Sequence, residues 1–69
     1  MPYGNIMRIE VERGFGFIRD DGGMEWFFVA EDVRDGRFEH IWTGERVGFT
    51  QEATPKGPRA ADIHPEQID

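Results

Sequence analysis

The clearest alternation of residue types along the chain lies in residues 13–18, which read Arg-Gly-Phe-Gly-Phe-Ile. Side chains of a β-strand project to opposite faces in turn, so Phe15 and Phe17 share one face of this segment. The two glycines and Ile18 share the other face. A strand over these residues therefore carries two aromatic rings on one side and little bulk on the other.

A second strand follows after a short acidic segment. Residues 20–23, Asp-Asp-Gly-Gly, tolerate a tight reversal, and residues 25–29 form an apolar run. The two segments are predicted to form a β-hairpin folded about Gly22. Turn geometry then fixes the register of the pairs. The predicted pairs are Phe17 with Phe27, Phe15 with Val29, and Arg19 with Glu25.

The hairpin has two apolar faces, and only one of them can be the core of so short a chain. If the bulkier set is buried, the other rings face solvent beside Arg13 and are suited to stacking on unpaired bases. The continuous apolar run at residues 26–30 lacks clean alternation and leaves the opposite assignment open. One face carries Phe15, Phe17 and Phe27; the other carries Ile18, Trp26 and Phe28.

The rest of the pattern predicts three more strands and no substantial helix. Residues 6–11 carry apolar side chains on both faces, which predicts a bulge or strong coiling. Residues 46–53 form the fourth strand, and residues 59–63 form the fifth, with Ala61 and Ile63 on the core side. Short strands at this spacing suggest a small closed barrel.

Two connections separate these strands. Residues 31–45 form a long link with one short 3₁₀ turn predicted near residues 31–33, and Ile41 is predicted to point inward. Residues 54–58 are predicted to be a loop, because neither of its prolines can donate to a ladder.

Length and composition limit the class of protein. Sixty-nine residues allow one domain, predicted over residues 1–66, with residues 67–69 as a frayed tail. The absence of cysteine excludes disulfides and thiolate chemistry, and no leader or membrane-length apolar run is visible, so a cytoplasmic location is expected.

The net charge of −6 argues, by itself, against a nucleic-acid ligand, which favours positive potential. The carboxylates, however, collect in predicted turns and tails, so we expect the charge to weaken affinity without deciding the class. An enzyme is not expected, because His40 and His64 are the two histidines and no base is paired with a nucleophile. No catalytic residue, metal site, cofactor or small-molecule substrate is predicted.

The segment at residues 13–18 resembles the first RNP motif of the cold-shock domain family, and residues 27–29 stand in the place of the second. The resemblance covers nearly the whole chain. It implies an all-β fold, a five-stranded antiparallel Greek-key barrel (OB-fold), and it implies that the three-phenylalanine face is exposed. Further positions that fit the family pattern are Gly4, Phe38, Gly44, Val47, Phe49 and residues 57–63.

The chain also departs from the family pattern. Arg8, Val29 and Ala30 stand where the family usually has tryptophan, histidine and phenylalanine, so three ring positions are lost. A guanidinium plane at Arg8 can still stack on a base. Trp26 and Phe28 replace smaller residues on the inner face, so a repacked core is expected. The binding site is therefore predicted to cover about three or four bases.

The resemblance implies binding of single-stranded RNA or DNA, with a pyrimidine preference and an RNA chaperone role that affects transcription or translation. The protein is expected to be a monomer without membrane contact. The alternative is a barrel with reduced nucleic-acid affinity that serves as a protein-interaction module. The predicted binding residues are Arg8, Arg13, Phe15, Phe17, Phe27, Val29, Phe38, Lys56 and Arg59.

Overall fold

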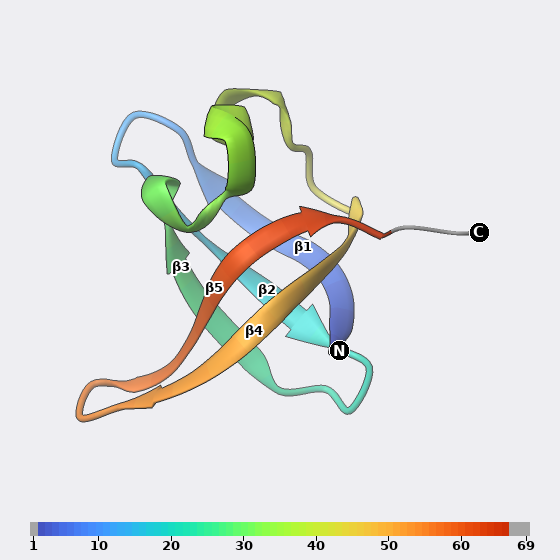
Figure 1. The fold of residues 1–69 in the computed structure, drawn as a ribbon, viewed down its shortest axis with the longest axis vertical. Helices are drawn as coiled ribbons and strands as arrows, with labels where there is room; N and C mark the ends of the chain where they lie inside the picture. The colour runs from blue at the N-terminus through green and yellow to red at the C-terminus, as the bar shows by residue number, and fades with distance from the viewer. Residues whose placement is uncertain (1, 67–69) are drawn as a thin grey trace.

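The fold is a closed barrel of five strands, seen in a computed structural model that describes residues 2–66 (Figure 1). The strands follow one another around the barrel in the order β1-β2-β3-β5-β4. The β3–β5 pair is parallel and the other pairs are antiparallel. The predicted all-β barrel is therefore confirmed. The strands are β1 (Tyr3–Glu10), β2 (Phe15–Asp20), β3 (Glu25–Val29), β4 (Arg46–Thr54) and β5 (Gly57–Pro65).

The β2–β3 hairpin has the predicted register. Phe17 lies opposite Phe27, Phe15 opposite Val29, and Arg19 opposite Glu25, with all three pairs as the turn geometry required. The arginine Nη2 of the last pair lies 3.4 Å from the glutamate carboxylate. A tight turn therefore sets which side chains share a face.

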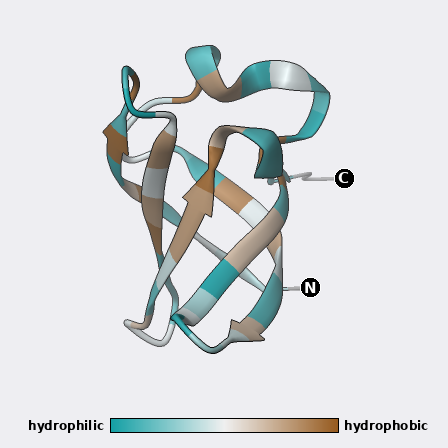
Figure 2. Ribbon diagram, turned by 90° about the vertical axis from the view of Figure 1, so that its left-hand side faces the viewer, coloured by the Kyte–Doolittle hydropathy of each residue, from teal (hydrophilic) through white to brown (hydrophobic). Residues whose placement is uncertain are grey.

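The bulkier face of the hairpin is the buried one. Ile18 and Phe28 are fully buried and Trp26 is 8% exposed. The opposite face remains partly open, with Phe27 36% exposed and its two neighbours on β2 half-buried. Figure 2 shows the hydrophobic colouring concentrated on the strands. The buried core of the barrel comprises Ile6, Ile18, Trp26, Phe28, Val33, Phe38, Val47, Phe49, Ala60 and Ile63.

Strand β1 bends over β2 at a point where only glycine fits. The register shifts between Ile6 and Arg8, so the predicted bulge is confirmed. A Cβ atom at Gly16 would lie 2.5 Å from the Arg8 carbonyl oxygen and 2.6 Å from Cζ of Phe28. The missing side chain therefore lets β1 and the large inner ring approach β2 together, which is how the core accommodates Phe28.

The bounds of β1, β4 and β5 differ from the sequence-based expectation, and β5 extends beyond the predicted residues 59–63 at both ends. β1 begins at Tyr3 and ends at Glu10, where residues 6–11 were predicted. The predicted loop at 54–58 is a two-residue turn, because Thr54 pairs with Gly57 and Ala53 with Pro58. Antiparallel pairs alternate between hydrogen-bonded and non-bonded, so the pair next to the turn-closing one tolerates a proline.

The inward pattern of β5 also differs from the prediction. Ala60 and Ile63 are fully buried, whereas Ala61, predicted to face the core, is half-buried. Asp62 has a positive φ of 49°, which interrupts the two-residue alternation and places inward side chains three positions apart. His64, one residue beyond the predicted end of the fifth strand, lies in β5 and is 7% exposed.

The link between β3 and β4 contains two 3₁₀ segments, η1 (Ala30–Asp32) and η2 (Arg34–His40). The first confirms the predicted short turn, and the second was not predicted. They lie at one end of the barrel (Figure 1). Ile41 packs against the core as expected. The predicted tail, residues 67–69, lies outside the described residues.

Acid is expected to destabilise the barrel through the carboxylate in the β2–β3 turn. The Asp20 carboxylate accepts hydrogen bonds from the Trp26 indole and the Met24 and Gly22 amides, at 2.8, 2.9 and 2.9 Å. These bonds, the indole bond first, hold the pKa of Asp20 below its usual value of 3.8. A lowered pKa in the folded state gives stability that is present above the unfolded pKa and lost as pH falls through the folded value.

Urea unfolding measured between about pH 6 and 2.5 should therefore show stability falling from about pH 4 downward. The Asp20→Asn variant should show a shallower fall, because its side chain does not titrate. Part of the fall should remain, since Arg46 and Arg34 lower the pKa of Asp21 and Asp62 respectively. An identical acid profile for the variant and the wild type would contradict this role.

Candidate functional site

Three phenylalanine rings form a contiguous surface on the outer side of the hairpin. Their centroids lie 6.1 Å apart for Phe15 and Phe17, 5.8 Å for Phe15 and Phe27, and 5.6 Å for Phe17 and Phe27. Cross-strand pairing places the β3 ring directly opposite a β2 ring. We call these three residues the ring face.

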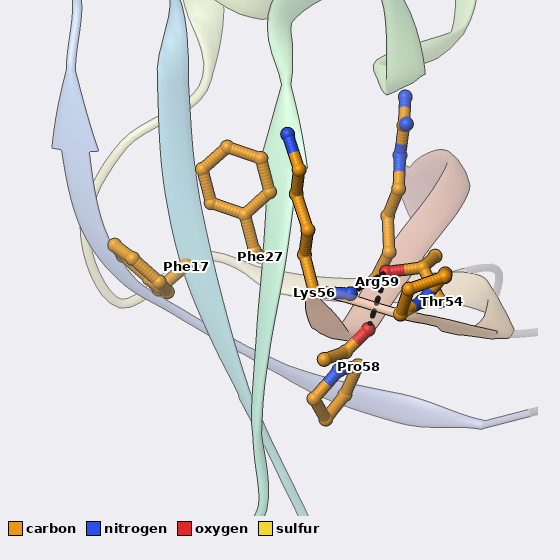
Figure 3. A pocket seen from close by; sticks show the side chains of 8 residues that line it. Phe17, Phe27, Thr54, Lys56, Pro58 and Arg59 are labelled. Carbon is orange, nitrogen blue, oxygen red and sulfur yellow. Dashed lines mark hydrogen bonds between the residues drawn. The ribbon is translucent and has the colours of Figure 1, made fainter.

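A groove of about 600 Å³ runs between the ring face and the β4–β5 hairpin. Figure 3 shows the Lys56 side chain extending beside Phe27, with Arg59 beyond it. Arg59 is also the residue that bridges to Phe27 in the parallel β3–β5 pair. The groove is lined by Phe17, Phe27, Thr54, Pro55, Lys56, Gly57, Pro58 and Arg59.

The four predicted cations differ in their partners. Arg8 lies 2.7 Å from the Glu10 carboxylate, and Arg59 lies 3.1 Å from the Asp32 carboxylate. Within residues 2–66, Arg13 and Lys56 take part in no ion pair within 4.0 Å. Because two of the four positive groups already face a carboxylate, the positive potential around the ring face is weaker than the count of cations suggests.

The neighbouring carboxylate of Asp32 stabilises the protonated form of the Arg59 guanidinium. Its hydrogen bonds to Asp32, followed by the attraction of that carboxylate, raise the pKa of Arg59 above its usual value. The Nε and Nη2 atoms donate to Asp32 at 3.1–3.3 Å, so the Nε–Nη2 edge of the planar guanidinium is the edge that faces the carboxylate.

The structure groups most of the predicted residues. Arg8 is the β-sheet partner of Phe17 across β1 and β2, and Val29 is the partner of Phe15. Arg13 lies in the turn just before β2 and is exposed. Lys56 and Arg59 line the groove together with Phe17 and Phe27.

Phe38 does not join this group, which corrects its prediction as a nucleic-acid-binding residue. It lies in η2, is 6% exposed, and its ring centroid is 6.3 Å from that of Phe28. The η2 segment turns this side chain over the end of the barrel, where it packs against the core. The ring face is therefore limited to residues of β2 and β3.

Sequence reasoning missed Asp32, which accepts the Val29 amide hydrogen bond at 2.9 Å in addition to pairing with Arg59. An aspartate three residues after the end of an extended segment is a recognisable signal for such a backbone contact. The prolines at 55 and 58 were interpreted only as loop residues, although both line the groove. Their contribution depends on the two-residue turn, which brings them toward β3.

The described part of the chain, residues 2–66, holds no group of three or more His, Asp or Glu side chains placed to bind a metal ion. In the same residues, no helix is long and apolar enough to cross a membrane.

Comparison with known proteins agrees with this architecture. The family described as 'Cold-shock' DNA-binding domain matches residues 3–66. The cold shock-like protein CspA of Vibrio cholerae is 36% identical over 87% of both chains. A probable cold shock protein A of Mycolicibacterium smegmatis is 31% identical over 91% of this chain and 96% of its own. Cold shock protein 1 of Lactiplantibacillus plantarum is 27% identical over 96% of this chain and 100% of its own.

Proposed function

This chain belongs to the cold-shock domain family, and we propose that it binds single-stranded RNA or DNA by stacking bases on the ring face. The observation that carries the proposal is the cluster of three surface rings within 6.1 Å of one another, beside a groove that contains a lysine and an arginine. Partly exposed aromatic rings clustered in this way are suited to stacking on the flat faces of unpaired bases. A duplex hides those faces and should bind weakly.

The expected site is short. Each stacked base contributes about 1–3 kcal/mol, and the ring face offers room for about three bases, with the groove available to one more or to the backbone. Arg13 and Lys56 are suited to contact phosphate, as are Arg8 and Arg59 once their carboxylate partners are displaced. Val29 adds apolar contact beside Phe15. An aromatic side chain at this position would extend the ring face further.

The cellular role follows from this mode of binding. A protein that traps unpaired bases holds weak hairpins open, which is an RNA chaperone activity and a way to affect transcription or translation. Stacking that is weak and reversible needs no ATP. Pyrimidine-rich strands are the preferred ligands in this proposal, and the protein acts as a monomer in the cytoplasm without a catalytic step.

Titration with a short oligothymidine at two salt concentrations tests the proposal. We expect low-micromolar or weaker binding, and a slope of log K against log salt of about −1.5 to −3, from about two to four phosphate contacts. NMR chemical shifts should move at the ring face and the groove. Arg8 removes the usual surface tryptophan reporter, so fluorescence quenching is the poorer readout. An absence of binding at about 100 µM protein would refute the function.

A second function, a protein-interaction module, is favoured by one observation: two of the four cations around the ring face are already paired with carboxylates. Under this alternative, the ring face contacts an apolar surface of another protein. Oligothymidine binding that depends on the rings decides between the two.

A further inference from the structure

The arginine at the far side of the groove is held by a nearly buried carboxylate. Arg59 Nη2 lies 3.2 and 3.1 Å from the two oxygens of Asp32, and Nε lies 3.3 Å from the second oxygen. The Asp32 side chain is 11% exposed, whereas the Arg59 side chain is 40% exposed. The carboxylate therefore sits beneath the guanidinium, and the guanidinium is the group that solvent reaches.

The position of this pair matters because Arg59 lines the groove beside Phe27. A nucleic-acid phosphate that reaches Arg59 finds the Nε–Nη2 edge of its guanidinium already turned toward Asp32. It also approaches a carboxylate, which repels it. The phosphate must either share the guanidinium or displace it from Asp32, and displacement leaves that carboxylate with the Val29 amide but without a cation.

We propose that Asp32 is an internal counter-ion that competes with backbone phosphate for Arg59 and so sets the affinity and salt dependence of the groove. The proposal rests on the function proposed above. Under this proposal, the expected low affinity for nucleic acid arises from the Asp32–Arg59 ion pair as well as from the lost aromatic residues. Asp32 acts through Arg59 and is a positioning residue.

The matched test compares Asp32→Asn with Asp62→Asn. Each change removes one negative charge and releases one arginine, because Asp62 holds Arg34 at 2.8 Å in the same two-pronged way. Arg34 lies in η2 and does not line the groove. Asparagine at 32 keeps an oxygen that can accept the Val29 amide bond. Asparagine also tolerates the positive φ at residue 62, so both variants should fold.

We expect Asp32→Asn to bind oligothymidine about two- to fivefold more tightly than wild type, the range of one partly exposed ion pair. The slope of log K against log salt should steepen by about 0.7, because one more phosphate contact releases one more counterion. Asp62→Asn should change affinity by less than about 1.5-fold, with an unchanged slope. Asp32→Ser, which also lacks charge and can cap the Val29 amide, should match Asp32→Asn.

The Arg59→Ala background separates this role from general charge removal. In that background, Asp32→Asn should no longer improve binding, since the released donor is gone. Equal gains for Asp32→Asn and Asp62→Asn, or weaker binding by both position 32 variants at temperatures where thermal melts show them folded, would overturn the proposal. Wild-type binding without such a gain refutes only this inference, whereas an absence of binding by all of the proteins refutes the proposed function as well.

Discussion

Replacing Phe15, Phe17 and Phe27 together by alanine is expected to abolish oligothymidine binding while the barrel stays folded. Each ring supplies about 1–3 kcal/mol of stacking, so single replacements should weaken binding by about 5- to 150-fold and the triple replacement should leave none measurable. The rings lie on the outer side of the hairpin, and the inner side holds the core. Isothermal titration or NMR titration measures the loss.

The fold of these variants can be checked independently. The inner residues Trp26 and Phe28 are untouched, so the dispersion of their NMR signals should persist. Loss of the contacts between the rings will lower the stability of the barrel. If the triple variant unfolds, the three single variants still test the contribution of each ring to binding. A triple variant that stays folded and binds as tightly as wild type would rule out ring stacking as the mode of binding.

Replacing Phe28 by alanine is expected to unfold the protein at room temperature. The side chain is fully buried, packs against Phe38 in a T-shaped arrangement, and lies against Gly16. Truncating a buried phenylalanine destabilises a domain by about 3–5 kcal/mol, which equals the whole stability that a core of this size usually supplies. Urea unfolding followed by circular dichroism measures the change.

Phe28→Leu provides the control, because leucine fills much of the same volume and should leave a folded barrel of lower stability. Its oligothymidine affinity should stay near that of wild type under folding conditions. A Phe28→Ala protein within about 1 kcal/mol of wild-type stability would show that this ring does not organise the core. Together, the inner and outer replacements separate stability from binding on one hairpin.

The pairing within the hairpin was predictable from the sequence, whereas the choice of its buried face was not. Its turn contains residues that reverse the chain tightly, so the pairing of Phe17 with Phe27 followed from local geometry. Which face is buried did not follow from alternation alone, because both faces are apolar. The resemblance to the family selected the face, and the burial of Phe28 confirmed that choice.

Other features depended on contacts between distant segments. The positive φ of Asp62 moved the inward position from Ala61 to Ala60, and local pattern carries no sign of that irregularity. Phe38 turned into the core because η2 lies over an open barrel end, which exists only once the strands have closed. The local sequence around an aromatic residue in a long link does not determine whether its ring is buried in the core or exposed to solvent.

The sequence by itself determined five short strands, the register of the central hairpin and the rings of the ring face, because turn chemistry and side-chain alternation act between near neighbours. Only the tertiary structure decided the charge environment of the groove. Asp32 and Arg59 are 27 residues apart and meet because β3 and β5 pair in the barrel. Long-range strand pairing brings together side chains whose separation in sequence holds no information about their contact.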